Sequence, residues 1–214
     1  KKMSEWLSDP LCEGIISILL SGKVETRDFL RPIFKWLKQG SKYFNPERAF
    51  LYIEWMIQIR DKGDETLNIN KQSHIQPKYA YNTIITMCQR NSDSENAMKA
   101  YNLMIKHLFE PDVFTMTALL DVIGRNGRFL EAIDMYRVMM NSNENLPNVV
   151  TFVTLIRVAS NLPDKTVAKQ YVKILLEDAH NLVNTSNTVQ LGDEDGNIVI
   201  SIYNATLSAC VRLN

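Results

Sequence analysis

Basic residues recur near the ends of several predicted helices. They are Lys42, Arg90, Arg125 and Arg212, and Asn161 takes the same position in one further helix. A row of cationic side chains can bind a phosphate backbone. Basic residues at a helix C-terminus also stabilise the helix dipole, so a purely local role is open as well. The two roles are compatible, and the first predicts a surface that binds a polyanion.

No pattern in the chain predicts catalysis or a metal centre. The three histidines, His74, His107 and His180, stand alone, without an H-x-E or H-E-x-x-H pattern. The three cysteines are far apart and form no Cys-x-x-Cys pair, which favours a reducing compartment. The acidic stretch "GDEDGN" lacks the ligand spacing of a calcium loop. We therefore expect a protein that is not an enzyme and that needs neither cofactor nor metal.

The composition is that of a chain with an ordinary buried core. Of its 214 residues, 45% are hydrophobic and 22% are charged. Lys+Arg and Asp+Glu both number 24, so binding to a phosphate backbone requires local clustering of the basic residues. Because no apolar run is long enough, we expect no membrane span. The chain stops at "YNATLSACVRLN" within a helical pattern, which we interpret as a fragment or a processed form.

Alanines mark an internal repeat. Ala97, Ala132 and Ala168 are spaced by 35 and 36 residues, and Ala49 is a more distant match. Apolar residues follow each alanine four and seven positions later, which places them on one face of a helix. Seven positions later stand Met56, Met104, Met139 and Leu175. We expect the small alanine to let a partner helix approach closely.

A further helix precedes each helix that contains a repeated alanine. One position in this preceding helix lies fifteen residues before the alanine. Phe34, Asn82, Thr117 and Val153 occupy it, and Asn204 takes the same place in a further copy. Loops that contain proline, "QPK", "EPD" and "LPN", separate the units. A hairpin of two helices every 35 residues predicts an all-α protein, a right-handed α-solenoid of about four hairpins.

This pattern predicts how the chain is organised. We expect an N-terminal helical segment at 1–27, a divergent repeat with a polar insertion at 28–77, repeats at 78–112, 113–148 and 149–199, the last with an extended acidic loop, and the first helix of a truncated repeat at 200–214.

Three stretches carry a family resemblance. They are "PKYAYNTIITMCQRNSDSENAMKAYNLMI", "PDVFTMTALLDVIGRNGRFLEAIDMYRVMM" and "PNVVTFVTLIRVASN". Together they resemble the pentatricopeptide repeat family, whose unit reads Pro-Asp-hydrophobic-x-x-Tyr-Asn-x-Leu-Ile, then a turn, Glu-Ala and a Met-rich second helix. The resemblance covers residues 78 to about 180, is weaker for 28–77, and after Ile200 is only a stub. The signature of the related tetratricopeptide array is missing.

Repeats of this family bind single-stranded RNA, one base per repeat, through two or three side chains. The resemblance implies that Asn82 with Asp112 reads uracil and that Thr117 with Asn148 reads adenine. Asn204 takes the reading position of the truncated repeat. The first two pairs together imply a preference for 5′-UA-3′. At two further reading positions, Val153 and Phe34 have no group that could recognise a base.

The resemblance also assigns the other contacts with RNA. Bulky side chains three positions before the reading residue would wedge between bases, and these are Tyr79, Phe114 and Val150. The basic residues that would contact phosphate are Lys42, Arg90, Arg125 and Arg212. The same wedge positions at a helix start are compatible with hydrophobic staples.

The expected function is therefore binding of single-stranded RNA in support of processing, stabilisation, splicing or translation. Members of the family act mostly in chloroplasts and mitochondria, so the resemblance implies one of these organelles. The alternative is a helical scaffold for protein–protein contacts in an organellar ribonucleoprotein or transcription complex. Protein partners or self-association into a longer array are compatible with both.

Overall fold

The computed structural model describes residues 45–47, 49–50, 53–54, 57, 77–142, 145–185 and 197–214. The predicted segment 1–27, most of the predicted divergent repeat, and the residues Phe34 and Lys42 lie outside the described residues. The chain divides into two compact units, Lys1–Met87 and Cys88–Asn214. In the described part of the first unit, the buried side chains include Ala49, Ile53, Tyr81 and Ile84.

The described residues form α-helices and contain no strand. The helices are α5 (Pro77–Arg90), α6 (Ser94–Lys106), α7 (Val113–Arg125), α8 (Phe129–Met140), α9 (Val149–Ala159), α10 (Lys165–Thr185) and α11 (Asn197–Leu213). Helix α5 begins in the first unit, and its last residues, 88–90, belong to the second. The predicted all-α fold of stacked helical hairpins is confirmed.

Short polar side chains define where the helices begin. Asp93, Asp112 and Asn148 are the N-caps of α6, α7 and α9, and each side chain accepts a hydrogen bond from a backbone N–H in the first turn. Between α7 and α8 the chain turns at Gly127, whose φ of 80° is a left-handed conformation that glycine adopts without strain. These signals are local, so the hairpins follow directly from the sequence.

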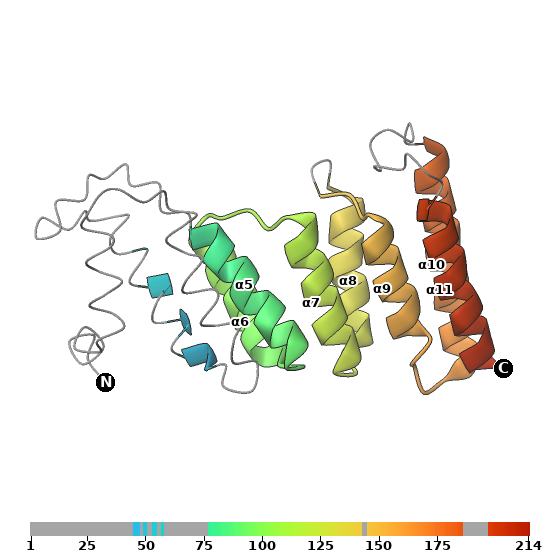
Figure 1. The fold of residues 1–214 in the computed structure, drawn as a ribbon, viewed down its shortest axis with the longest axis horizontal. Coiled ribbons are helices and arrows are strands. Elements are labelled where there is room, and N and C mark those ends of the chain that lie inside the picture. The colour runs from blue at the N-terminus through green and yellow to red at the C-terminus, as the bar shows by residue number, and fades with distance from the viewer. Residues whose placement is uncertain are drawn as a thin grey trace, which may run out of the picture. The chain divides into compact units, whose positions relative to one another are not determined.

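Within the second unit the helices form two layers (Figure 1). The first helices of successive hairpins, α7, α9 and α11, pack against one another in chain order. The second helices cover them, because α8 packs against α7, and α10 packs against both α9 and α11. Helix α6 also contacts α7. Each hairpin thus buries its apolar face against its neighbours, as repeat arrays do.

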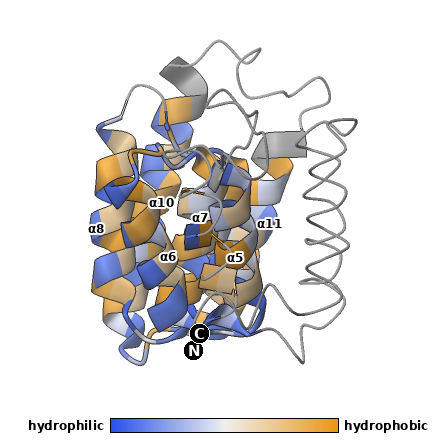
Figure 2. Cartoon of the chain, turned by 90° about the vertical axis from the view of Figure 1, so that its left-hand side faces the viewer, coloured by the Kyte–Doolittle hydropathy of each residue, from blue (hydrophilic) through white to orange (hydrophobic). Residues whose placement is uncertain are grey.

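The predicted alanine stripe is part of the core. Ala97, Ala132 and Ala168 have no exposed surface, and Met139 and Leu175, seven positions after the last two alanines, are 1% exposed. Figure 2 shows that single helices carry both hydrophobic and hydrophilic residues. A helix with this pattern can bury its hydrophobic face and leave the other face in solvent. Among the described residues, no helix combines the length and the hydropathy needed to cross a membrane.

The lack of a side chain at Gly124 determines how closely α7 packs against α9. A Cβ atom added at this glycine would overlap with the Cγ1 atom of Val158 on α9. Because Val158 is only 3% exposed, its side chain has little room to move away. The absence of a side chain at Gly124 therefore allows the two first helices to pack closely near their C-terminal ends.

We expect Gly124→Ala to lower the free energy of unfolding by about 1–3 kcal/mol, because overpacking forces helices apart. In a Val158→Ala background the same change should be neutral or stabilising, since alanine favours a helix over glycine by about 1 kcal/mol. Denaturant unfolding followed by circular dichroism measures all four proteins of this cycle. Equal effects of Gly124→Ala in both backgrounds would show that Val158 does not restrict this position.

Candidate nucleic-acid interface

A buried carboxylate collects polar side chains from three consecutive first helices. Asp121 of α7 is 1% exposed. Its Oδ2 atom accepts a hydrogen bond of 2.6 Å from Nε2 of Gln89 on α5. Its Oδ1 atom accepts bonds of 2.7 Å from Nε of Arg125 and 2.5 Å from an Nη atom of Arg157 on α9. Arg125 makes a second bond to Oδ2, so it binds the carboxylate with two nitrogens.

This cluster carries a surplus of positive charge. One carboxylate faces the two guanidinium groups of Arg125 and Arg157, which leaves a formal charge of one positive unit. The carboxylate is buried, while both arginine side chains are 39% exposed. Asp121 therefore fixes the direction of two arginines whose outer edges still face solvent, and an anion at the surface can reach them.

Burial by itself would raise the pKa of Asp121. The hydrogen bonds from Arg125 and Gln89, together with the charges of Arg157 and Arg125, outweigh burial and hold the pKa below its ordinary value. The carboxylate is thus ionised in the folded protein at neutral pH, and its ionised form contributes to stability.

Of the predicted phosphate contacts, the structure places three at the ends of first helices. Arg90 is exposed at the end of α5, and Arg125 ends α7. Arg212, near the end of α11, donates bonds of 3.4 Å to Oγ of Ser160 and 3.3 Å to Oδ1 of Asn161. The fourth, Lys42, lies outside the described residues.

The sequence analysis missed Arg157. The third repeat has Asn161 at the position that is basic in its neighbours, and it carries its arginine one helical turn earlier. The contact of Arg157 with Asp121 brings this guanidinium next to that of Arg125. A search that allowed a shift of one turn along the same helix face would have found it.

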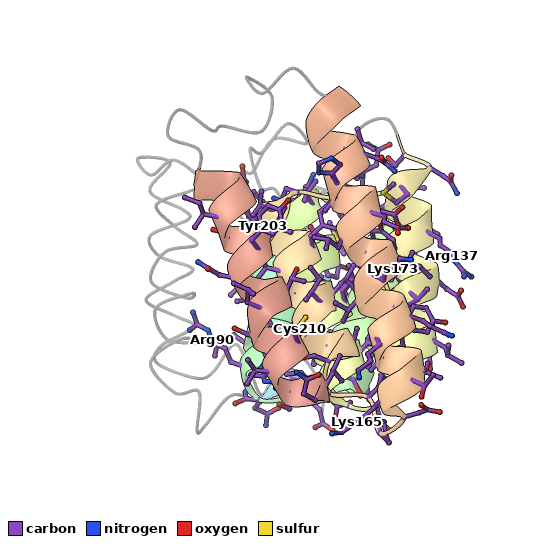
Figure 3. The ribbon with its side chains drawn as sticks, turned by 90° about the vertical axis from the view of Figure 1, so that its right-hand side faces the viewer. Arg90, Arg137, Lys165, Lys173, Tyr203 and Cys210 are labelled. Atoms are coloured by element: carbon purple, nitrogen blue, oxygen red, sulfur yellow. The ribbon has the colours of Figure 1, made fainter. Side chains whose placement is uncertain are left out.

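Figure 3 shows that Arg90 lies apart from two cations of the second helices. Arg90 lies at one side of the view, and Arg137 of α8 and Lys173 of α10 lie at the other. Arg137 and Lys173 are 67% and 77% exposed, and each pairs with an acidic residue on its own helix. They provide matched controls for any role assigned to the cations of the first helices.

The predicted base-reading residues differ in their surroundings. Thr117 is 8% exposed, and its hydroxyl lies 2.8 Å from the hydroxyl of Thr151 on α9. Asn82 is half-buried on α5, and Asn204 is exposed on α11. Val153, which has no polar group, is half-buried at the equivalent position of α9.

The second member of each predicted reading pair is a helix cap. Oδ1 of Asp112 accepts bonds from the backbone N–H and the hydroxyl of Thr115, at 2.9 and 2.8 Å. Oδ1 of Asn148 accepts the same two bonds from Thr151, at 3.0 and 3.1 Å. The caps hold these side chains in one orientation at the start of α7 and α9.

The predicted wedge residues are large apolar side chains in contact with solvent. Tyr79, Phe114 and Val150 are 55%, 77% and 58% exposed. A hydrophobic staple would bury such a side chain against its own helix, and exposure of this extent is not what a staple produces. The same repeat position is thus apolar and exposed three times.

Comparison with known proteins identifies the repeats. The PPR repeat family matches residues 78–125 and 111–161, which include helices α5 to α9. A pentatricopeptide repeat-containing protein of Arabidopsis thaliana is 34% identical over 80 residues, which make up 37% of this chain and 13% of that protein. The chain therefore spans a small part of the length of this relative. Residues 78–161 therefore match pentatricopeptide repeats (PPR).

The lowered pKa of Asp121 predicts a loss of stability in acid. A carboxyl group whose pKa is lower in the folded state stabilises the protein above its unfolded pKa, and this contribution disappears as the pH falls through the folded pKa. We expect Asp121→Asn to lower the free energy of unfolding by about 1–3 kcal/mol at pH 7, since it leaves two arginines without their counter-ion. The difference from the wild type should shrink below about pH 4.

Asp134→Asn is the matched control, because Asp134 is 71% exposed and pairs with Arg137 at the surface. Its effect should be below about 1 kcal/mol at every pH. Urea unfolding at a series of pH values measures both variants. A difference between the wild type and Asp121→Asn that stays constant from pH 7 to pH 3 would contradict the assignment.

Proposed function

We propose that this chain binds single-stranded RNA, with one base held by each intact repeat, in support of organellar RNA processing, stabilisation, splicing or translation. The exposed apolar residues Tyr79, Phe114 and Val150 carry the proposal, because they recur at one repeat position and remain accessible to solvent. Aromatic side chains such as those of Tyr79 and Phe114 stack on unpaired bases, which all have a π-face. Val150 would offer an apolar contact at the same position.

The arginines of the first helices support the same function. Arg125 and Arg157 share one carboxylate, and Arg90 and Arg212 lie near the ends of α5 and α11. Phosphate is a good ligand for guanidinium groups because two N–H donors match two oxygen atoms. The chain as a whole is neutral, so its affinity for RNA has to come from such local clustering.

Within this function, we assign base recognition to two repeats. Asn82 with Asp112 would read uracil, and Thr117 with Asn148 would read adenine. Val153 cannot donate or accept a hydrogen bond, so the third repeat would hold a base without selecting it. Asn204 takes the reading position of a further repeat, of which this sequence contains only the first helix, so it forms no complete pair. Two selected bases are too few to define one transcript, so specificity has to come from further repeats, self-association or partners. The relation to PPR proteins supports a chloroplast or mitochondrial location.

A scaffold for protein contacts is the second candidate function, and helix α11 favours it. Tyr203 and Leu207 are 49% and 63% exposed, whereas Phe152 and Ile156, at the same positions of α9, are buried. Figure 3 shows Tyr203 and Cys210 on α11, which lies beside α10. An apolar face of this kind suits a second helix, either from a partner protein or from a longer array.

We expect binding to a single-stranded RNA that contains UA to weaken steeply as the salt concentration rises. The reason is that arginines bound to phosphates displace counterions from the RNA backbone, and high salt opposes this release. For single strands, each phosphate contact contributes about 0.7 to the slope of log K against log salt. Arg90→Ala should lower this slope by about 0.7 and weaken binding to all sequences alike. Fluorescence anisotropy at several salt concentrations provides the measurement.

Arg137→Ala serves as the control, since it removes an exposed arginine from the second helices. The slope for this variant should equal that of the wild type. If the wild type binds no RNA at low salt while remaining folded, the RNA function is wrong and the scaffold function is favoured.

Phe114→Ala tests the wedge. We expect it to weaken RNA binding by about 1–3 kcal/mol, the range of one base–aromatic stack. Its effect on the free energy of unfolding should be within about 0.5 kcal/mol, because the ring is 77% exposed. The same titration combined with denaturant unfolding measures both quantities.

Leu130→Ala is the control, since Leu130 is 67% exposed on helix α8 of the same hairpin. It should leave RNA affinity unchanged. Equal losses of affinity in Phe114→Ala and Leu130→Ala would indicate a general apolar surface in place of a wedge.

A further inference from the structure

Opposite charges occupy the same repeat position on two neighbouring first helices. Four residues after the predicted reading position stand Asp121 on α7 and Arg157 on α9. The two side chains meet, because an Nη atom of Arg157 donates a bond of 2.5 Å to Oδ1 of Asp121. On α11 the same position is Ser208, whose hydroxyl donates to the backbone carbonyl of Asn204 on its own helix. The charge pair is thus particular to the contact between α7 and α9.

Arg157 also stands in a repeat whose neighbouring positions on this helix face are uncharged. Eight residues after the reading position, α7 has Arg125, whereas α9 has Asn161. The reading position of α9 itself is Val153, whose side chain has no hydrogen-bonding group. Arg157 lies one helical turn, about 5.4 Å, closer to the reading position than Asn161 does. It is therefore the charged group that the third repeat, 149–199, presents along this face.

The carboxylate of Asp121 accepts as many hydrogen bonds as it can. A carboxylate has about four lone-pair sites. Gln89 and Arg125 each donate one bond to Oδ2, and Arg125 and Arg157 each donate one bond to Oδ1. Because the group is also buried, it offers no acceptor to a ligand from solution. Its role towards a ligand can only be indirect, through the groups that it holds.

The two arginines, in contrast, keep most of their donors. A guanidinium group has five N–H donors in a planar fork. Arg125 uses two of them on Asp121, and Arg157 uses one. Among the described residues, neither guanidinium donates to any other acceptor. Both side chains are 39% exposed, so the remaining donors can bind an acceptor from solution.

The shared carboxylate also brings the two guanidinium groups side by side. Both donate to the same atom, Oδ1 of Asp121, at 2.7 Å from Arg125 and 2.5 Å from Arg157. An acceptor that reaches one group is therefore close to the other. A phosphate group in an RNA backbone suits this arrangement, since it offers several oxygen acceptors and one negative charge. That charge equals the surplus positive charge of the cluster.

We propose that Arg125 and Arg157 bind one and the same phosphate of the RNA, and that Asp121 is the positioning residue that holds them together. The proposal rests on the proposed function and adds to it how many phosphates this cluster binds and which one. That phosphate joins the base held by repeat 113–148 to the base held by repeat 149–199. The third repeat thus contributes to affinity, although it selects no base.

RNAs with single neutral linkages test the proposal. The probes are the hexanucleotide CCUACC and five versions of it, each with one phosphate replaced by an uncharged methylphosphonate. Fluorescence anisotropy measures their binding to the wild type, Arg125→Ala, Arg157→Ala and the variant with both substitutions. Circular dichroism verifies that every variant is folded.

We expect the wild type to lose about tenfold in affinity when the linkage on the 3′ side of A is neutral, as for a lost hydrogen bond to a charged group. In the variant with both substitutions, this replacement should have no effect. The same variant should lower the slope of log K against log salt by about 0.7, the value for one phosphate. Two arginines on two separate phosphates would lower it by about 1.4.

Asp121→Asn distinguishes positioning from charge. Removal of a negative charge beside a polyanion strengthens binding if electrostatic attraction alone is at work. If Asp121 positions the arginines, the substitution should instead weaken binding and remove most of the penalty at the linkage after A. Arg137→Ala is the control, since Arg137 is a 67% exposed arginine on α8. It should reproduce every penalty and the slope of the wild type.

The outcomes separate the inference from the proposed function. If the folded wild type binds none of these RNAs at low salt, the proposed function is wrong. Binding with the largest penalty at another linkage, or a change in slope near 1.4, would overturn only the shared phosphate. Tighter binding by Asp121→Asn would overturn its positioning role. The scan with the wild type and the arginine variants decides the shared phosphate even if Asp121→Asn does not fold.

Discussion

The ion-pair cluster around Asp121 joins α7 to α9 and to Gln89 within the second unit. Its carboxylate binds Gln89 at the end of α5, Arg125 on its own helix and Arg157 on α9. An uncompensated charge in this position would be strongly unfavourable, because the carboxylate is buried. In the same packing of α7 on α9, the hydroxyl of Thr117 lies beside that of Thr151, and the outer edges of the two arginines stay exposed.

Two of the residues proposed to recognise bases also cap helices. Asp112 and Asn148 cap helices α7 and α9, and they are also the second members of the proposed reading pairs. An N-cap is typically worth about 1 kcal/mol, so replacing either residue changes stability in addition to any effect on the proposed base recognition. A cap also limits the orientations of the side chain before any RNA arrives. Preorganisation of this kind lowers the entropic cost of binding.

The exposed apolar side chains differ from the capping residues, because they contribute little to the stability of the fold. Phe114 and Val150 are more than half exposed, although each is the second residue of a capped helix. Their exposure is compatible with a hairpin whose core is supplied by other residues, such as Leu119 and Leu155. Separate residues for packing and for contact with a ligand allow the surface of a repeat to vary while the array remains intact.

The helical hairpins, their period and the alanines of the core could be predicted from the pattern of residues. These features depend on residues within about one or two turns of each other, and caps such as Asp112 act over three residues. Three contacts could not be predicted in this way: Arg157 joins Arg125 at Asp121, Gly124 faces Val158, and Thr117 is bonded to Thr151. The partners in these contacts are more than 30 residues apart. Their pairing depends on the rotation and separation of neighbouring helices, which the period of a repeat leaves open.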